Sequence, residues 1–281
     1  MLITLLVTPF TMLSAADGPS KPKIIFILAD DLGIGNVSCY GADNYKTPNI
    51  HKLASTGMRF SGNGVYLKND ISKGTTCQVN GQDKKLGDKY MPDLMHEHLV
   101  GFMKQHLLDP FFVYHSMSHV HGEIVATPDS AKDSKDLFGD NVAYMDKLVG
   151  KLVAELESLK LRENTLIIFI GDNGTAKGQA KSSTVRRRDL SGQKGTMFEC
   201  GGLVPLIVSW PSKAPAGKVC SDLGDSTDFI PTFAELTGSK LPTKTVFDGH
   251  SIAPQLRGEV GQSREWIYNQ LASMWYVREA G

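Results

Sequence analysis

The sequence predicts an α/β fold in which a mostly parallel or mixed central sheet carries helices on both faces. Short apolar runs at residues 23–29, 166–170 and 204–210 are typical of strands that are buried on both sides. Segments with helical apolar spacing lie between these runs, and strands that alternate with long helices predict a parallel sheet. A chain of 281 residues is long enough to bury the core that such a sheet requires.

The first half of the chain is expected to supply two strands and two helices. Residues 23–29 (KIIFILA) form the first strand. Residues 47–57 form a short helix, because Thr is favoured before a helix, Pro at its first position and Gly near its end. Residues 93–108 have helical apolar spacing and lead through an Asp-Pro pair into a strand at residues 111–115.

The second half contains the clearest helix, which we predict at residues 138–159. Its apolar residues form one stripe, with charged residues off it. A buried strand is predicted at residues 166–170, another at 204–210 and a helix at 228–237. The residues of the stripe are Val142, Met145, Leu148, Val149, Leu152, Val153 and Leu156.

Two stretches, residues 61–89 and 175–192, carry no periodicity. Both are rich in Gly, Lys, Asn, Asp, Ser and Thr. The first is long for a structureless connection inside a compact domain, so the α/β pattern does not account for it.

The first sixteen residues differ from the rest of the chain. Residues 2–13 are mostly apolar but too short to span a bilayer, and a Ser-Ala-Ala run follows them. We predict a signal peptide at residues 1–16, a linker at 17–22, the main domain at 23–270 and the start of a C-terminal region at 271–281. The alternative is a buried N-terminal strand or a frayed end. The expected location is secreted, periplasmic or lysosomal-type, with no transmembrane segment.

The charges are balanced, with 30 Lys and Arg against 30 Asp and Glu. No overall field therefore favours nucleic acid or an anionic membrane. An anionic substrate must instead be held by a local site, and the sequence is silent on oligomeric state.

Four cysteines lie far apart, without zinc-site spacing. In an exported protein some of them can pair as disulfides, and free buried thiols are the other reading. They are Cys39, Cys77, Cys200 and Cys220.

Carboxylates follow two of the predicted strands. Asp30 and Asp31 come directly after the first strand, and Asp172 and Asn173 follow the strand at 166–170. Sites in open α/β sheets form at the carboxyl ends of strands. Each pair alone is typical of a turn. Together they offer hard oxygen ligands, which predicts a site for Ca²⁺ or Mg²⁺ rather than zinc.

Several motifs resemble those of sulfatases, a family in the alkaline-phosphatase-like superfamily. Residues 22–33 (PKIIFILADDLG) are similar to the family's opening strand and its first metal ligands. Taken together, the motifs cover most of residues 22–270 and are specific to an arylsulfatase-like domain. The other similar segments are residues 39–41 (CYG), 47–50 (TPNI), 164–174, 192–195 (GQKG), 199–205, 228–236 and 248–251 (DGHS).

The resemblance implies roles for particular residues. Asp30, Asp31, Asp172 and Asn173 would bind a divalent cation, usually Ca²⁺ in sulfatases and alternatively Mg²⁺. Lys194 would hold a sulfate oxygen or assist the leaving group, where negative charge grows in the transition state. The substrate would be a small sulfate ester or a sulfated glycan.

A histidine is expected near the end of the strand at 111–115. His121 best matches the family position that binds or protonates the substrate oxygen, and an imidazole suits proton transfer near neutral pH. His119 is the second candidate, whereas His115 is expected to belong to the strand. A purely structural histidine is the other reading.

The sulfatase nucleophile is missing. The sequence contains neither C-x-P-x-R nor S-x-P-x-R, so no matching motif can yield the family's formylglycine. The family's G-K-x-H segment is also absent, and Leu203 replaces an Arg. Because the resemblance breaks just after Phe60, we expect an incomplete domain, internally shortened after about residue 60.

Three explanations follow. The chain is a fragment or gene-model product, a non-catalytic secreted protein that binds metal or a sulfated ligand, or a superfamily phosphodiesterase or phosphatase that uses a hydroxyl of Ser61, Thr75 or Thr76. We predict a sulfatase-type hydrolase of sulfate esters that uses a divalent cation and whose turnover is impaired.

Overall fold

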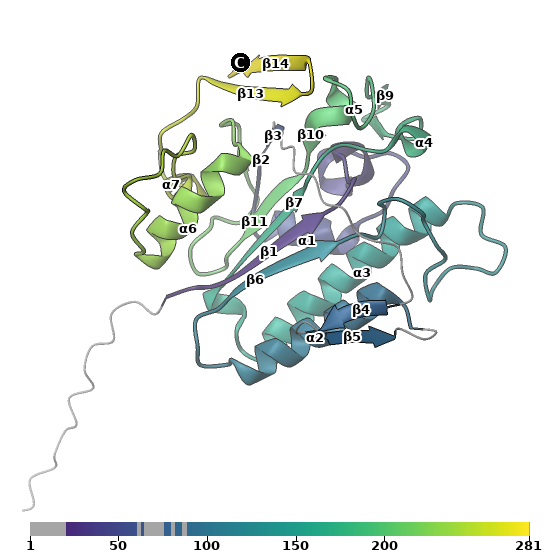
Figure 1. Ribbon diagram of the computed structural model, residues 1–281, viewed down its shortest axis with the longest axis horizontal. Coiled ribbons are helices and arrows are strands. Elements are labelled where there is room, and N and C mark those ends of the chain that lie inside the picture. The colour runs from purple at the N-terminus through teal and green to yellow at the C-terminus, as the bar shows by residue number, and fades with distance from the viewer. Residues whose placement is uncertain (1–20, 61–62, 65–75, 80–81, 86–88, 281) are drawn as a thin grey trace, which may run out of the picture.

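The computed structural model describes residues 21–60, 63–64, 76–79, 82–85 and 89–280. Its centre is a six-stranded sheet in the order β12-β2-β11-β7-β1-β6 (Figure 1). Strand β1 runs parallel to β6 and β7, β11 runs antiparallel to β7 and β2, and β12 runs parallel to β2. The predicted mixed α/β sheet is confirmed. The strands are β1 Lys23–Ala29, β2 Met58–Phe60, β6 Phe112–Met117, β7 Thr165–Gly171, β11 Leu206–Ser209 and β12 Lys218–Cys220.

The two central strands explain the continuous apolar runs in the sequence. All seven residues of β1 and all seven of β7 are buried, because both strands have neighbours on each side and helices above and below. The single strand predicted at residues 204–210 is wrong in detail. It is interrupted at Pro205, which has no N–H to donate, and so divides into β10 (Leu203–Val204) and β11.

Three helices cover one face of the sheet: α1 (Pro48–Ser55), α2 (Met91–Gln105) and α3 (Leu137–Ser158) (Figure 1). The stripe predicted for α3 lies in this core, where Val153 is only partly buried. The predicted helix at 93–108 begins earlier, with Pro in its first turn. Thr47 precedes α1 but does not cap it, because its hydroxyl accepts a hydrogen bond from the backbone of Ser38 (2.9 Å).

Helices α6 (Phe229–Thr237) and α7 (Ala253–Leu256) contribute to the core on the opposite face. Alternate residues of β1 supply the two cores, since successive side chains of a strand point to opposite sides. Ile25 and Ile27 pack with the α3 side, whereas Phe26 packs edge-on against Phe229 of α6 at 4.9 Å.

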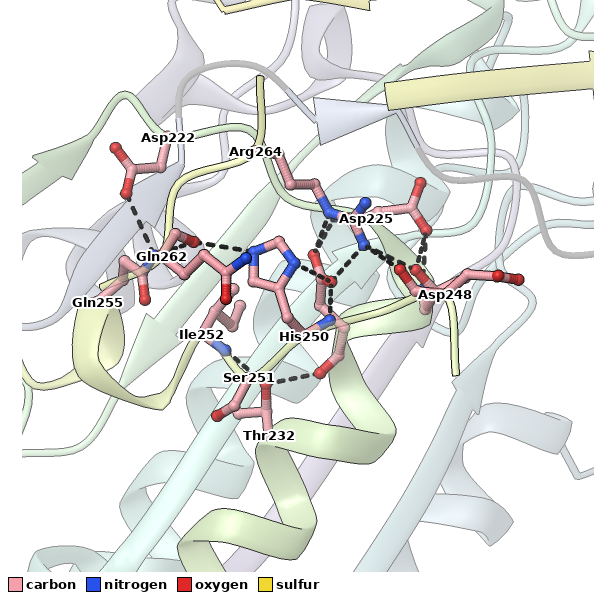
Figure 2. A network of polar contacts seen from close by, with 12 residues as sticks. Asp222, Asp225, Thr232, Asp248, His250, Ser251, Ile252, Gln255, Gln262 and Arg264 are labelled. Carbon is pink, nitrogen blue, oxygen red and sulfur yellow. Dashed lines mark hydrogen bonds and ion pairs between the residues drawn. The ribbon is translucent and has the colours of Figure 1, made fainter. Parts of the chain in front are cut away.

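A polar cluster ties the C-terminal segment to the start of α6 (Figure 2). Asp228 has a fully buried side chain, and Arg264 donates to both of its carboxylate oxygens. The backbone N–H groups of His250 (3.0 Å) and Asp225 (2.9 Å) donate to the same carboxylate. Thr232 bridges the carbonyl of Asp228 and the N–H of Ile252. We call these residues the Asp228 cluster. They bond to one another and have a structural role.

The remaining elements are short. A hairpin of β13 (Trp266–Leu271) and β14 (Met274–Glu279) crosses the domain boundary predicted at residue 270. Among the residues that the structure describes, no helix could cross a membrane. The predicted signal peptide lies outside the described residues. The other elements are η1 Ile34–Asn36, η2 Ser38–Tyr40, β3 Asn63–Gly64, β4 Thr76–Val79, β5 Gln82–Lys85, η3 Arg162–Asn164, α4 Lys177–Ala180, β8 Thr184–Val185, β9 Arg188–Asp189, α5 Glu199–Gly202 and η4 Ser226–Asp228.

Candidate functional site

The carboxyl ends of β1 and β7 lie side by side. The two strands are parallel and in register, with Ala29 opposite Gly171. Asp30 and Asp172 are therefore the first residues beyond two adjacent strand ends, and the N–H of Asp172 donates to the carbonyl of Ala29 (3.2 Å). The structure thus brings together the two motifs that the sequence placed at strand ends.

All four residues predicted as metal ligands are buried, with at most 3% of their surface exposed. One oxygen of Asp172 accepts hydrogen bonds from the backbone N–H groups of Asp31 (2.9 Å) and Asn173 (2.7 Å). The Asn173 amide in turn donates to the Asp31 carboxylate (2.7 Å). Asp31 has a φ of 62°, in the left-handed region that non-glycine residues rarely occupy, and such strain is common at functional sites.

His121 approaches the same carboxylates from the other neighbour of β1. Strand β6 pairs with β1, and the carbonyl of Met117 accepts a hydrogen bond from Asp30 (3.0 Å). Four residues further on, Nδ1 of His121 lies 4.0 Å from Oδ2 of Asp30. One ligand atom each from Asp30, Asp31 and His121 lie within 4.8 Å of one another. The sequence predicted His121 as a substrate-binding group and did not anticipate that it would join the ligand cluster.

His119, the second candidate, lies elsewhere. It is 5% exposed, and its ring centroid lies 6.1 Å from that of Tyr90 and 6.4 Å from that of Tyr144. Neither ring nitrogen has a hydrogen-bond partner among the described residues. Burial lowers the pKa of His119 to about 3, which keeps the ring neutral. His115 is buried within β6, as expected, and burial likewise lowers its pKa to about 4.

Lys194 reaches the site from the loop before α5. Its ammonium group pairs with the carboxylate of Asp31, and its backbone N–H donates to the carbonyl of Thr175 (2.7 Å). Burial opposes the charge of Lys194, but the hydrogen bond to Asp31 and the nearby carboxylates raise its pKa. The lysine is therefore charged, and about a third of its side chain remains exposed to an approaching anion.

The electrostatics of the carboxylates suit a cation. Burial, and then the charge of Asp30, raise the pKa of Asp172 to about 8. Burial is also the main cause that raises the pKa of Asp30, whose Oδ2 has no hydrogen-bond partner among the described residues. Crowded, desolvated carboxylates with an unpartnered oxygen are stabilised when a divalent cation binds. The all-oxygen set of the four predicted ligands fits Ca²⁺ or Mg²⁺.

No described cysteine is poised as a nucleophile. Burial raises the pKa of Cys39 to about 11 and also raises those of Cys200 and Cys220, so the three free thiols are protonated. The alternative nucleophiles Ser61 and Thr75 lie outside the described residues. For Thr76, only the backbone in β4 is described.

Sequence reasoning missed a polar cluster behind the site. Asn36, Thr175 and Ser183 are buried and bonded to one another, next to the loops that carry the predicted ligands. Two of them lie in the stretch 175–192, which has no periodicity. The one sequence signal for this cluster was the hydroxyl of Thr175, two residues after Asn173.

Comparisons with known proteins agree on one family. A sequence model of the sulfatase family matches residues 62–239. Human arylsulfatase D is 31% identical over 199 residues, which cover 67% of this chain. N-acetylgalactosamine-6-sulfatase from Canis lupus familiaris is 23% identical over 362 residues, covering 90% of this chain and 69% of that protein.

The fold has a close counterpart among solved structures. The crystal structure of Ps i-CgsB in complex with k-i-k-neocarrahexaose superposes with a TM-score of 0.76 and 21% identity, over 92% of this chain and 86% of the other. The chain spans 34% of the length of human arylsulfatase D.

Proposed function

The chain belongs to the sulfatase family, whose members are hydrolases of sulfate esters, and we propose that its site binds a divalent cation and a sulfate ester. The observation that carries the proposal is the convergence of Asp30, Asp31, Asp172 and Asn173 at two adjacent strand ends. Calcium is the proposed cation, with Mg²⁺ as the alternative, because the donors are carboxylate and amide oxygens.

Each side chain has a distinct part in this proposal. A cation held by these four residues would offset negative charge on a sulfate group in the site. Lys194 donates N–H groups to a sulfate oxygen, with Asp31 holding its ammonium at the mouth of the site. His121, with its Nδ1 facing Asp30, presents its other ring nitrogen for a hydrogen bond to the substrate oxygen. His119 takes no part, because it is enclosed by aromatic rings.

Turnover by this chain is proposed to be impaired. The sequence has no C-x-P-x-R or S-x-P-x-R motif, so the family's nucleophile has no counterpart. The alignment with N-acetylgalactosamine-6-sulfatase runs over 362 residues, more than the 281 of this chain, so that relative contains segments that this chain lacks. Loss of one such segment after about residue 60 accounts for the missing motif.

The proposed ligand is a sulfate ester on a small molecule or glycan. One relative is named for a sulfated amino sugar, and a structural neighbour was solved with an oligosaccharide. We also propose export to a secreted, periplasmic or lysosomal-type compartment, which the apolar run at residues 2–13 supports.

Two alternative functions differ from this proposal. A non-catalytic secreted protein that binds a metal or a sulfated ligand is favoured by the missing nucleophile motif. A phosphodiesterase or phosphatase with a Ser or Thr nucleophile requires a hydroxyl near the cation. Lys194 and a ligand set for a single cation weigh against this second alternative.

Thermal unfolding of the full chain after chelation tests the site. Added Ca²⁺ should raise the melting temperature more than Mg²⁺ does, since binding to the folded state alone stabilises it. The protein should bind 4-nitrophenyl sulfate without hydrolysing it. No response to either cation would refute the cation site, and aryl-sulfate turnover would refute impairment. Hydrolysis of bis(4-nitrophenyl) phosphate that a Ser or Thr replacement abolishes would establish the phosphodiesterase.

A further inference from the structure

A closed ring of hydrogen bonds lies directly behind the candidate site. Thr175 donates its hydroxyl proton to the amide oxygen of Asn36 (2.6 Å), and the Asn36 amide donates to the hydroxyl of Ser183 (3.3 Å). Ser183 donates to the hydroxyl of Thr175 (3.3 Å), which closes the ring. All three side chains are at most 1% exposed. Each hydroxyl thus donates one hydrogen bond and accepts one, away from water.

The ring joins the segments that carry the charged groups of the site. Asn36 ends η1, which follows the Asp30-Asp31 pair, and Thr175 comes two residues after Asn173. The backbone of Thr175 adds two further bonds, because its carbonyl accepts from Lys194 (2.7 Å) and its N–H donates to Cys200 (3.0 Å). Thr175 is therefore bonded to the Lys194 loop, and through Asn36 to the segment that follows the Asp30-Asp31 pair.

Close packing limits any adjustment around the ring. A Cβ at Gly33 would lie 2.7 Å from the hydroxyl of Thr175, and one at Gly35 would lie 2.8 Å from Cβ of Ser183. A Cβ at Gly174 would lie 1.9 Å from the carbonyl of Cys200. Because Gly33 and Gly35 lie directly against the side chains of Thr175 and Ser183, and Gly174 lies against the Cys200 carbonyl, a shift of Thr175 is passed directly to its neighbours.

We infer that Thr175 is a positioning residue for the site: its hydroxyl and carbonyl fix Lys194 and the two ligand loops relative to one another. The inference rests on the proposed function for its consequence in cation binding. Loss of the Thr175 hydroxyl leaves the Asn36 oxygen and the Ser183 proton without partners in a dry interior, which loosens the ring. Residues that orient metal ligands affect affinity about 10- to 100-fold when they are replaced.

The test compares Thr175→Val with Thr175→Ser in the full chain. Val has nearly the shape of Thr but no hydroxyl, whereas Ser keeps the hydroxyl. Calcium titration calorimetry should show affinity about tenfold weaker or more for Thr175→Val and near wild type for Thr175→Ser. Ser183→Ala breaks the same ring elsewhere and should weaken affinity in the same direction, which keeps the test open if Thr175→Val fails to fold.

Thr232→Val is the matched control. Thr232 is also fully buried and makes two hydrogen bonds, but it does so in the Asp228 cluster. Its replacement should lower the melting temperature without changing calcium affinity. Equal losses of affinity in Thr175→Val and Thr232→Val would reduce the effect to general destabilisation and overturn the inference.

Hydrogen exchange without cation separates this inference from the proposed function. The N–H of Lys194, bonded to Thr175, should exchange faster in Thr175→Val than in wild type, and should not change in Thr232→Val. Unchanged protection at Lys194 overturns the inference. A wild-type protein that binds no cation refutes the proposed function alone, because exchange at Lys194 still decides the positioning role.

Discussion

Two regions of the molecule bury aspartates to the same degree and compensate them in opposite ways. Asp228 is 0% exposed, and Asp30 and Asp172 are each 1% exposed. Arg264 and two backbone N–H groups surround Asp228, so the protein neutralises that charge itself. Asp30 and Asp172 adjoin each other instead: burial raises the pKa of both carboxyls, and the charge of Asp30 raises that of Asp172 further.

The contrast distinguishes a carboxylate with a structural role from one that we propose binds a cation. Burying a charge is costly unless it is paired and hydrogen-bonded, so a folded protein tolerates an unmatched carboxylate pair only at a price in stability. Such a cost is typical of functional sites. The same residue type, at the same depth, therefore has a structural role in one region and supports the proposed cation site in the other.

The largest expected effect comes from a substitution in the Asp228 cluster. Arg264→Ala should lower the free energy of unfolding by about 3–5 kcal/mol, because it leaves the buried Asp228 charge without its cation. Chemical denaturation of the cation-free protein measures this loss. Calcium affinity should not change.

Arg257→Ala is the control, since Arg257 pairs with exposed Glu235 and Glu259. Exposed pairs contribute about 1 kcal/mol or less, so this variant should be nearly as stable as wild type. Equal losses of unfolding free energy in the two arginine variants would show that the burial of Asp228 does not determine the size of the effect.

The same substitution should have opposite effects in the two regions. Asp172→Asn should abolish stabilisation by Ca²⁺ while leaving the cation-free protein as stable as wild type or more stable. The Asn oxygen can still accept from Asp31 and Asn173, and its amide can donate to Asp30. Asp228→Asn should lower stability and leave calcium binding intact. Calorimetry and denaturation on both variants measure the contrast.

The advantage of Asp172→Asn should depend on pH. Because the folded pKa of Asp172 is raised to about 8, the stability linked to its proton is complete below the unfolded pKa near 3.8 and is lost as pH rises to about 8. The variant should therefore gain on wild type across that range without cation. An advantage that shrinks as pH rises would contradict the assignment.

The smallest expected effect concerns His119, which belongs to neither of the two regions. Its buried ring nitrogens have no hydrogen-bond partner among the residues that the structure describes. Its folded pKa of about 3 lies below the unfolded value, so its contribution is present above pH 6.5 and is lost as pH falls towards 3. Between pH 6.5 and 5 this loss is about 2 kcal/mol. His119→Phe should lack that part of the acid sensitivity in denaturation experiments, and equal sensitivity would refute it.

The sequence predicted the elements whose signal is local. Residues 23–29 form β1 as predicted, and the predicted helix at 138–159 differs from α3 by one residue at each end. Strands β2 and β12 were missed, because three residues carry no usable period and these strands exist only through pairing with each other and with β11. Pro205 divides the strand predicted at residues 204–210, because that prediction relied on apolar content alone.

The sequence by itself determined the chemistry at the strand ends, since an apolar run followed by Asp-Asp or Asp-Asn is written in consecutive residues. Only the tertiary structure decided which groups meet there. It placed His121 beside Asp30, enclosed His119 between Tyr90 and Tyr144, and closed the ring through Thr175. The physical reason is that burial and hydrogen bonding depend on contacts between distant segments, which no local period records.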